Sequence, residues 1–112
     1  MSKYFSRKTE VDGIVFDSAA EARRWRELRL LERAGRISGL RRQVPYVFLV
    51  HTTGTEPECG EDKRQMRYVA DFVYVEGGRE VVEDVKGYRT AEYKRKRRLM
   101  RNVYGVDIRE TR

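Results

Sequence analysis

The stretch VADFVYVEGGREVVEDVKG, residues 69–87, predicts two antiparallel β-strands joined by a tight turn. Gly77 and Gly78 suit a two-residue turn because glycine tolerates the positive φ angles that such turns require. With these glycines as the loop, Glu76 pairs with Arg79, and this pair sets the register of the whole hairpin. The stretch therefore predicts a β-hairpin of known register.

Two carboxylates face each other in this register. Asp71 lies directly opposite Asp84, and Lys86 lies opposite Val69, on the same face and one pleat along. Directly opposed side chains have Cβ atoms roughly 4.5–5.5 Å apart, where like charges are destabilising. A sequence that keeps two acids there is expected to hold a cation between them, or to raise the pKa of one.

The alternative is that these acids lie on the solvent face of a one-sided sheet. Both faces of the hairpin are apolar, however. Tyr68, Ala70, Phe72 and Tyr74 are expected on one face, and Val69, Val73, Val75 and Val82 on the other. A strand that is apolar on both sides is usually covered on both sides, which favours a covered site for the acids. Glu83 alternates onto the face opposite Asp84 and is expected to be exposed or ion-paired.

A third acid comes from a predicted helix that begins after Ser18 and ends at Gly35. Glu21, Trp25 and Leu28 recur at helical spacing, so Glu21 continues the buried stripe of the helix. Glu21 also stands three residues after Ser18, the spacing of a capping box. The two roles, helix cap and contributor to a site, compete for one carboxylate, and the spacing leaves both open.

The remaining pattern indicates one α/β domain over residues 1–112, with elements in the order α-β-β-β-α-β. Residues 1–17 are expected to be extended, with a turn at Asp12-Gly13. Strands are expected at about 40–50, 68–76, 79–86 and 106–110, and the second helix from Thr90 to about Tyr104, closed by Gly105. The polar residues 51–67 show no apolar period and predict a mobile loop.

The charge of the chain points to a polyanionic partner. Lys and Arg number 25 against 18 acids, a formal net charge of +7, and DNA is the simplest such partner. No membrane span is expected, because the chain has no run of 18 apolar residues, and a membrane surface is the less favoured partner, because no predicted helix has a broad apolar face with aromatic anchors. The first residues lack the apolar stretch of a signal peptide, and Cys59 is the sole cysteine, so a reducing cytoplasm is expected. His51 and Cys59 are too few for a zinc site.

Basic residues crowd the second predicted helix and the segment that leads into it. They are Arg89, Lys94, Arg95, Lys96, Arg97, Arg98 and Arg101. A run of charge is commonly just a solvated helix face, but Glu92 is the one acid in this helix, so ion pairing offsets little of the repulsion. Nucleic-acid binding explains the run better, through phosphate contacts that carry position and no sequence information.

The carboxylates and the lysine together suggest a metal-dependent hydrolase. Hard oxygen ligands suit Mg²⁺, which binds through one or two carboxylates, water and substrate phosphate, and Mn²⁺ is expected to substitute. Such an ion stabilises charge on a scissile phosphate and helps to deprotonate water. Lys86 would position that water or stabilise the transition state.

The spacing of these residues resembles the PD-(D/E)xK nuclease superfamily, and more closely a family of small phage-encoded nucleases within it. The stretches that carry the resemblance are DGIVFDSAAEARRW, YVADF, VVEDVKG and the basic helix ending in MRNVYG. The resemblance implies a restriction-endonuclease-like core, a mixed sheet flanked by helices. It also implies that Asp71 and Asp84 are metal ligands together with the Val85 backbone carbonyl, that Lys86 is the catalytic lysine, and that Glu21 is the helix acid, bound directly or through water. Ala70 stands where the superfamily is named for a proline.

The function that this resemblance implies is an endonuclease that hydrolyses DNA and leaves a 5′-phosphate and a 3′-hydroxyl. Some phage members of the superfamily resolve Holliday junctions, so branched DNA is an expected substrate, in the cytoplasm of a bacterial host. Resolving both strands of a junction needs two sites, which suggests a homodimer. Ordinary duplex or RNA is a further alternative substrate. The alternative from another class is a non-catalytic basic DNA-binding protein, in which the acids merely pair with arginines.

Overall fold

The structure is a computed structural model that describes residues 8–51, 63–85 and 89–111. Its elements are β1 (Thr9–Val11), β2 (Ile14–Phe16), α1 (Ala19–Arg33), β3 (Ser38–His51), β4 (Lys63–Glu76), β5 (Arg79–Val85), α2 (Ala91–Leu99), the π-helical turn η2 (Met100–Tyr104) and β6 (Arg109–Thr111). From α1 onward this order confirms the predicted mixed α/β arrangement. The leading residues form a separate β1–β2 hairpin, turned at Asp12 and Gly13 as expected.

The main sheet has the strand order β3-β4-β5-β6, in which β6 runs parallel to β5 and the other pairs are antiparallel. Such a mixed sheet is what the sequence predicts. The predicted hairpin register is confirmed, because Glu76 pairs with Arg79 and Phe72 pairs with Glu83. Gly77 and Gly78 both have positive φ angles, 60° and 79°, as a two-residue hairpin turn requires.

The prediction of a loop over residues 51–67 is wrong at both ends. β3 runs to His51 and β4 begins at Lys63, and these two residues pair with each other. The polar segment therefore extends a ladder, because backbone pairing with a neighbouring strand outweighs weak strand propensity. Residues 52–62, which include Cys59, lie outside the part of the chain that the structure describes.

A break in the pleat of β3 and β4 changes which side chains share a face. The ladder passes from Arg42–Phe72 to Val44–Ala70, and Gln43, which would oppose Asp71, has a left-handed φ of 54°. The expected alternation through Tyr68, Ala70, Phe72 and Tyr74 is consequently wrong. Tyr68 and Ala70 belong to one hydrophobic cluster, whereas Phe72 and Tyr74 belong to the other.

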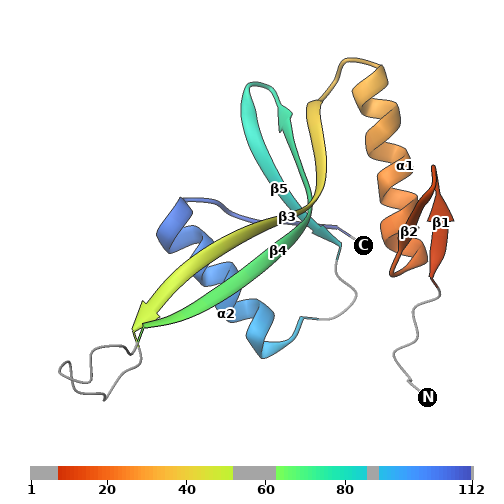
Figure 1. Ribbon diagram of the computed structural model, residues 1–112. Coiled ribbons are helices and arrows are strands. Elements are labelled where there is room, and N and C mark those ends of the chain that lie inside the picture. Colours follow the sequence, from red (N-terminus) through yellow and green to blue (C-terminus); the bar gives the residue numbers. More distant parts are fainter. Residues whose placement is uncertain (1–7, 52–62, 86–88, 112) are drawn as a thin grey trace.

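The two hydrophobic clusters cover opposite faces of the hairpin, one under each helix (Figure 1). The α1 cluster consists of Phe16, Ala22, Trp25, Leu28, Ile37, Phe72 and Tyr74. The α2 cluster consists of Phe48, Tyr68, Ala70, Val73, Val82, Tyr93, Met100 and Ile108. The expectation that both faces of the hairpin are covered is therefore confirmed where β4 pairs with β5.

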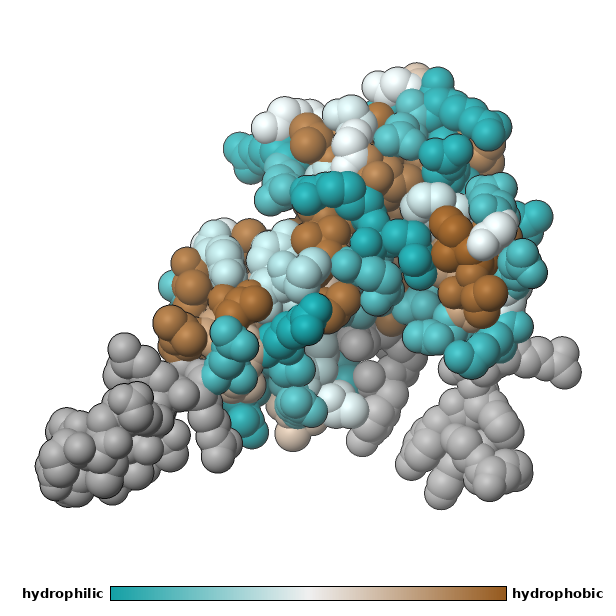
Figure 2. Space-filling view, in the orientation of Figure 1, coloured by the Kyte–Doolittle hydropathy of each residue, from teal (hydrophilic) through white to brown (hydrophobic). Residues whose placement is uncertain are grey.

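Cover is incomplete at the far end of the β3–β4 ribbon. α2 packs on one face there, and Val47 and Leu49 on the other face are 42% and 69% exposed. Figure 2 shows apolar residues gathered over this outer end, whereas polar residues cover much of the rest of that view. No helix within the described residues is long and apolar enough to cross a membrane.

Both helices begin and end where the sequence predicts. Ser18 and Thr90 cap them, each accepting a hydrogen bond from a backbone amide three residues on. The second helix continues through η2 and ends at Gly105, which has a left-handed φ of 68°. The last strand is shorter than expected, because residues 106–108 pack against the α2 cluster before β6 begins.

Candidate active site

Three carboxylates from three elements line one pocket of about 390 Å³. Glu21 comes from the first turn of α1, Asp71 from β4 at the break in the ladder, and Asp84 from the end of β5. Tyr93 and Lys96 of α2 line the opposite wall. The structure thus brings together the three acids that the sequence singles out.

Asp71 lies at the centre of this group. Its Oδ2 accepts a hydrogen bond of 2.9 Å from the backbone amide of Val85, and its carboxyl also contacts the carboxyls of Glu21 and Asp84. The pKa of Asp71 is raised to about 6, mainly by burial and in part by the negative charge of Glu21, while the hydrogen bond from the Val85 amide opposes the rise. One of the two facing carboxyls thus has a raised pKa, as the sequence predicts, but burial and Glu21 are what raise it, whereas the hydrogen bond with the facing Asp84 lowers it.

Asp84 is held more tightly than Asp71. Its side chain is only 3% exposed, and its Oδ2 accepts a short hydrogen bond from the Tyr68 hydroxyl. Burial raises the pKa of Tyr68 strongly and the charge of Asp84 adds to the rise, so this phenol stays protonated and remains a donor. Tyr68 therefore fixes one oxygen of Asp84, a supporting role that alternation alone did not assign to it.

Glu21 divides its two predicted roles between backbone and side chain. Its amide donates a 3.1 Å hydrogen bond to the Ser18 hydroxyl, which is half of the predicted capping box. Its carboxyl lines the pocket and lies within hydrogen-bonding reach of Asp71. Helix capping by Ser18 therefore leaves the Glu21 carboxyl available to the site.

Glu83 anchors the opposite side of β5 to α1. It is fully buried, and its two oxygens accept bonds of 2.6 and 3.1 Å from Arg24, with Tyr74 and Thr111 as further donors. Of the two predicted alternatives for Glu83, the ion pair is confirmed and exposure to solvent is not. Because Arg24 lies one helical turn after Glu21, this ion pair also fixes how α1 presents Glu21 to the pocket.

The donor set of the pocket fits a hard divalent cation bound partly through water. Within the described residues, no three His, Cys, Asp or Glu side chains are arranged to hold an ion by themselves. Mg²⁺ does not need such a cage, since it commonly keeps several waters and takes one or two carboxylates. Asp71 and Asp84 suit direct ligation, and Glu21 suits contact through water. Lys86 follows the last described residue of β5 and lies outside the described part of the chain.

The sequence matches one family model over residues 1–111, described as a protein of unknown function, DUF1064. The chain belongs to this family. No curated protein matches it significantly.

An ion-pair network around Glu110 of this DUF1064 chain was not predicted from the sequence. Glu110 on β6 lies beside Asp84 on β5 and accepts hydrogen bonds from Arg89, Arg97 and Tyr93, at 2.9, 2.9 and 2.7 Å. Although burial opposes the change, these three donors lower the pKa of Glu110 to about 2. A parallel pair formed by strands distant in sequence leaves no local signal by which Glu110 could have been found.

The basic residues of α2 and η2 divide between two flanks of the helix. Lys96 lines the carboxylate pocket and pairs with Glu92 at 3.4 Å. Four other basic residues of the helix line a second pocket, on the side of β6. They are Lys94, Arg97, Arg98 and Arg101. Most of the predicted DNA-binding residues are thus not on the same flank as the carboxylates.

Proposed function

We propose that this protein is a metal-dependent endonuclease that hydrolyses phosphodiester bonds of DNA on a restriction-endonuclease-like core. The observation that carries the proposal is the meeting of Glu21, Asp71 and Asp84, from α1, β4 and β5, in one pocket. Facing carboxylates destabilise a fold unless a cation or a proton lies among them, so their presence is best explained by function.

The charge distribution supports a nucleic-acid substrate. The chain carries a net charge of +7, yet this pocket concentrates acids. An anionic phosphate approaches such a pocket favourably only when the carboxylates are neutralised, which is the role of a divalent cation in phosphodiester hydrolysis. Surrounding arginines and lysines supply the attraction for the remaining phosphates.

Each residue has a distinct role in this proposal. Asp71 and Asp84 hold Mg²⁺ or Mn²⁺ with the Val85 carbonyl, and Glu21 binds the metal-bound water or the ion. When bound, the ion stabilises negative charge on the scissile phosphate and lowers the pKa of water. The Tyr68 hydroxyl orients Asp84, and the Val85 amide orients Asp71. Lys86 is the proposed catalytic lysine, placed by sequence directly after Val85.

The substrate is proposed to be branched DNA, bound by a homodimer. A symmetric dimer offers two equivalent sites, which cutting both strands of a junction requires. This part of the proposal follows from the resemblance to junction-resolving members of the superfamily and from the predominance of backbone-binding residues, which read shape and position and not base sequence.

A cleavage panel tests the proposal. Four-way junction, flap, duplex and single strand are incubated at equal concentration with Mg²⁺, with Mn²⁺ and with a chelator. Metal-dependent nicking that Asp84→Asn abolishes is the expected result. Glu80→Gln is the matched control, because Glu80 is a half-exposed acid of the same strand, paired with Arg41. Binding of all four substrates without nicking under any metal condition would instead identify a non-catalytic basic DNA-binding protein.

A further inference from the structure

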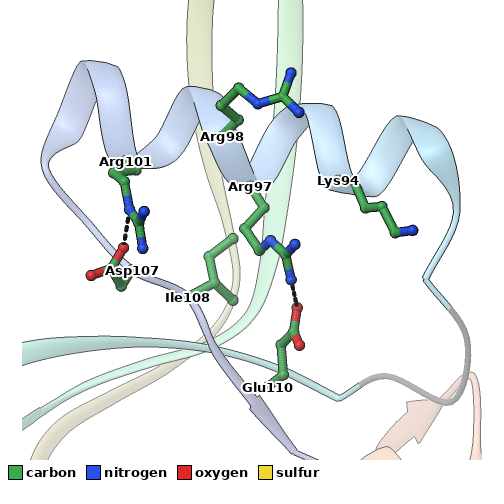
Figure 3. Close-up of a pocket in the computed structure, with 7 residues that line it drawn as sticks. All are labelled: Lys94, Arg97, Arg98, Arg101, Asp107, Ile108 and Glu110. Atoms are coloured by element: carbon green, nitrogen blue, oxygen red, sulfur yellow. Dashed lines mark hydrogen bonds and ion pairs between the residues drawn. The ribbon is translucent and has the colours of Figure 1, made fainter.

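The pocket on the β6 flank of α2 has a strongly basic lining. It has a volume of about 390 Å³, and its charged lining consists of four basic side chains and two acids. Figure 3 shows Arg97 and Arg101 reaching from the helix toward Glu110 and Asp107, with Ile108 between them, whereas Lys94 and Arg98 extend from the helix in other directions. The lining therefore carries an excess of two positive charges.

Two of the four cations are held in place by the acids. Arg97 donates to Glu110 at 2.9 Å through one terminal nitrogen, and Arg101 donates to Asp107 at 2.6 Å through Nε. A guanidinium has five N–H donors, so each arginine keeps further donors for a ligand. These ion pairs orient the two arginines before any ligand arrives.

The other two cations are not neutralised by any described residue. Lys94 and Arg98 are exposed, and within the described ranges neither forms an ion pair with a carboxylate. Like charges on successive turns of one helix repel each other. An oxyanion bound between them would relieve this repulsion and accept charge-assisted hydrogen bonds.

This basic pocket lies across α2 from the carboxylates. Tyr93 stands between the two sites, since it lines the carboxylate pocket while its hydroxyl donates to Glu110 in the basic pocket. A helix with its side chains is about 10–12 Å across. A phosphate in the basic pocket is therefore not the one beside the carboxylates but one farther along the backbone.

We propose that the basic pocket of Lys94, Arg97, Arg98 and Arg101 binds a backbone phosphate of the substrate, so that the nucleic acid crosses over α2 from the carboxylate pocket to the β6 edge of the sheet. The inference rests on the proposed nuclease function for the identity of the substrate. It adds a second anchoring point for the substrate, away from the phosphate that is cut.

Methyl NMR of the full chain distinguishes the two sites, because each pocket has its own apolar reporter. Inorganic phosphate should shift the Ile108 methyl resonances and leave Val69, which lines the carboxylate pocket, unchanged. The double variant Lys94→Ala with Arg98→Ala should lose this shift. The control variant Arg33→Ala with Arg79→Ala removes two exposed cations elsewhere and should keep it.

DNA supplies the decisive measurement. In the presence of Mg²⁺, with the Lys86→Ala chain so that the DNA stays uncut, a DNA strand long enough to cross α2 should shift Ile108 and Val69 together, relative to Mg²⁺ alone. The double variant should reduce the salt dependence of DNA affinity by about one unit, for the one phosphate that the pocket binds, and more than the control variant does. DNA that shifts Val69 but leaves Ile108 unmoved would overturn the inference, as would equal slopes for the two double variants.

The same spectra separate this inference from the proposed function. Mg²⁺ should shift Val69 and not Ile108 if the carboxylates bind metal. A phosphate response at Ile108 without any Mg²⁺ response at Val69 would count against the nuclease site while leaving the anion site standing. A Mg²⁺ response at Val69 without a phosphate or DNA response at Ile108 would count against the anion site while leaving the proposed nuclease site standing.

Discussion

Replacing Asp71 by Asn should stabilise the metal-free protein at neutral pH. Asp71 is the carboxyl whose pKa is raised to about 6 by burial and by the charge of Glu21. Asn fills nearly the same space, cannot ionise, and keeps an oxygen that can accept the Val85 amide. The substitution therefore removes an unfavourable charge and keeps the local hydrogen bond.

The magnitude follows from the size of the pKa shift. The pKa rises from an ordinary 3.8 to about 6, and each unit corresponds to about 1.36 kcal/mol, so ionising Asp71 in the fold costs about 3 kcal/mol. Because the folded state holds its proton more tightly than the unfolded state, the free energy of unfolding falls as pH rises between these two values. Above pH 6 the full loss is present, and below pH 4 it is absent.

Urea denaturation in the presence of a chelator, at intervals from pH 4 to pH 8, measures this loss. Wild type should become less stable by about 3 kcal/mol across the range, and Asp71→Asn should lack most of that slope. Asp17→Asn is the control, because the Asp17 side chain is 85% exposed. Saturating Mg²⁺ should restore wild-type stability at neutral pH, through binding to the folded state, and should leave Asp71→Asn unchanged. An Asp71→Asn protein less stable than wild type at pH 7 would refute the argument.

Three further substitutions test separate contacts. Lys86→Ala should abolish cleavage in single-turnover assays while anisotropy shows normal DNA binding, because its proposed role is in the reaction; normal cleavage would remove it from the mechanism. Arg24→Met strands the buried Glu83 carboxylate and should cost about 3–5 kcal/mol in urea denaturation, whereas a loss below 1 kcal/mol would mean that the pair is weakly coupled. Tyr68→Phe removes the donor to Asp84 and should weaken Mn²⁺ binding by roughly 10–100-fold in calorimetry, with an unchanged affinity arguing against its supporting role.

Local chemistry explains which parts of the fold could be predicted from the sequence. The Gly77-Gly78 turn sets the hairpin register, and this register alone predicts that Asp71 and Asp84 lie close together, next to the Phe72–Glu83 pair. Ser18 and Thr90 marked the two helix starts for the same reason, because a capping side chain acts within three residues of itself. Each of these features depends on neighbours close in the chain.

Long-range contacts explain what could not be predicted. The local sequence of residues 63–67 does not predict a strand, because these residues form a strand only by pairing with β3. The left-handed Gln43 interrupts the pleat opposite Asp71 and reassigns Tyr68 to the cluster under α2, where its hydroxyl reaches Asp84. Simple alternation placed Tyr68 on the other face from Asp84, so it missed the residue that holds that carboxylate.

Adjacent residues of β5 have opposite tasks, and this couples the stability of the fold to the geometry of the site. Glu83 points toward α1, where Arg24 satisfies its charge, while Asp84 points into the pocket, where Asp71 is its near neighbour. The first pair holds α1 against the sheet and so holds Glu21, one turn earlier on that helix, against Asp71. A change at Glu83 therefore acts on the pocket through α1 without touching any substrate. Arg24 thus satisfies the charge of Glu83 on one face of β5, whereas Asp84 on the other face neighbours Asp71, the carboxyl whose pKa is raised, so a cation bound on that face would add stability.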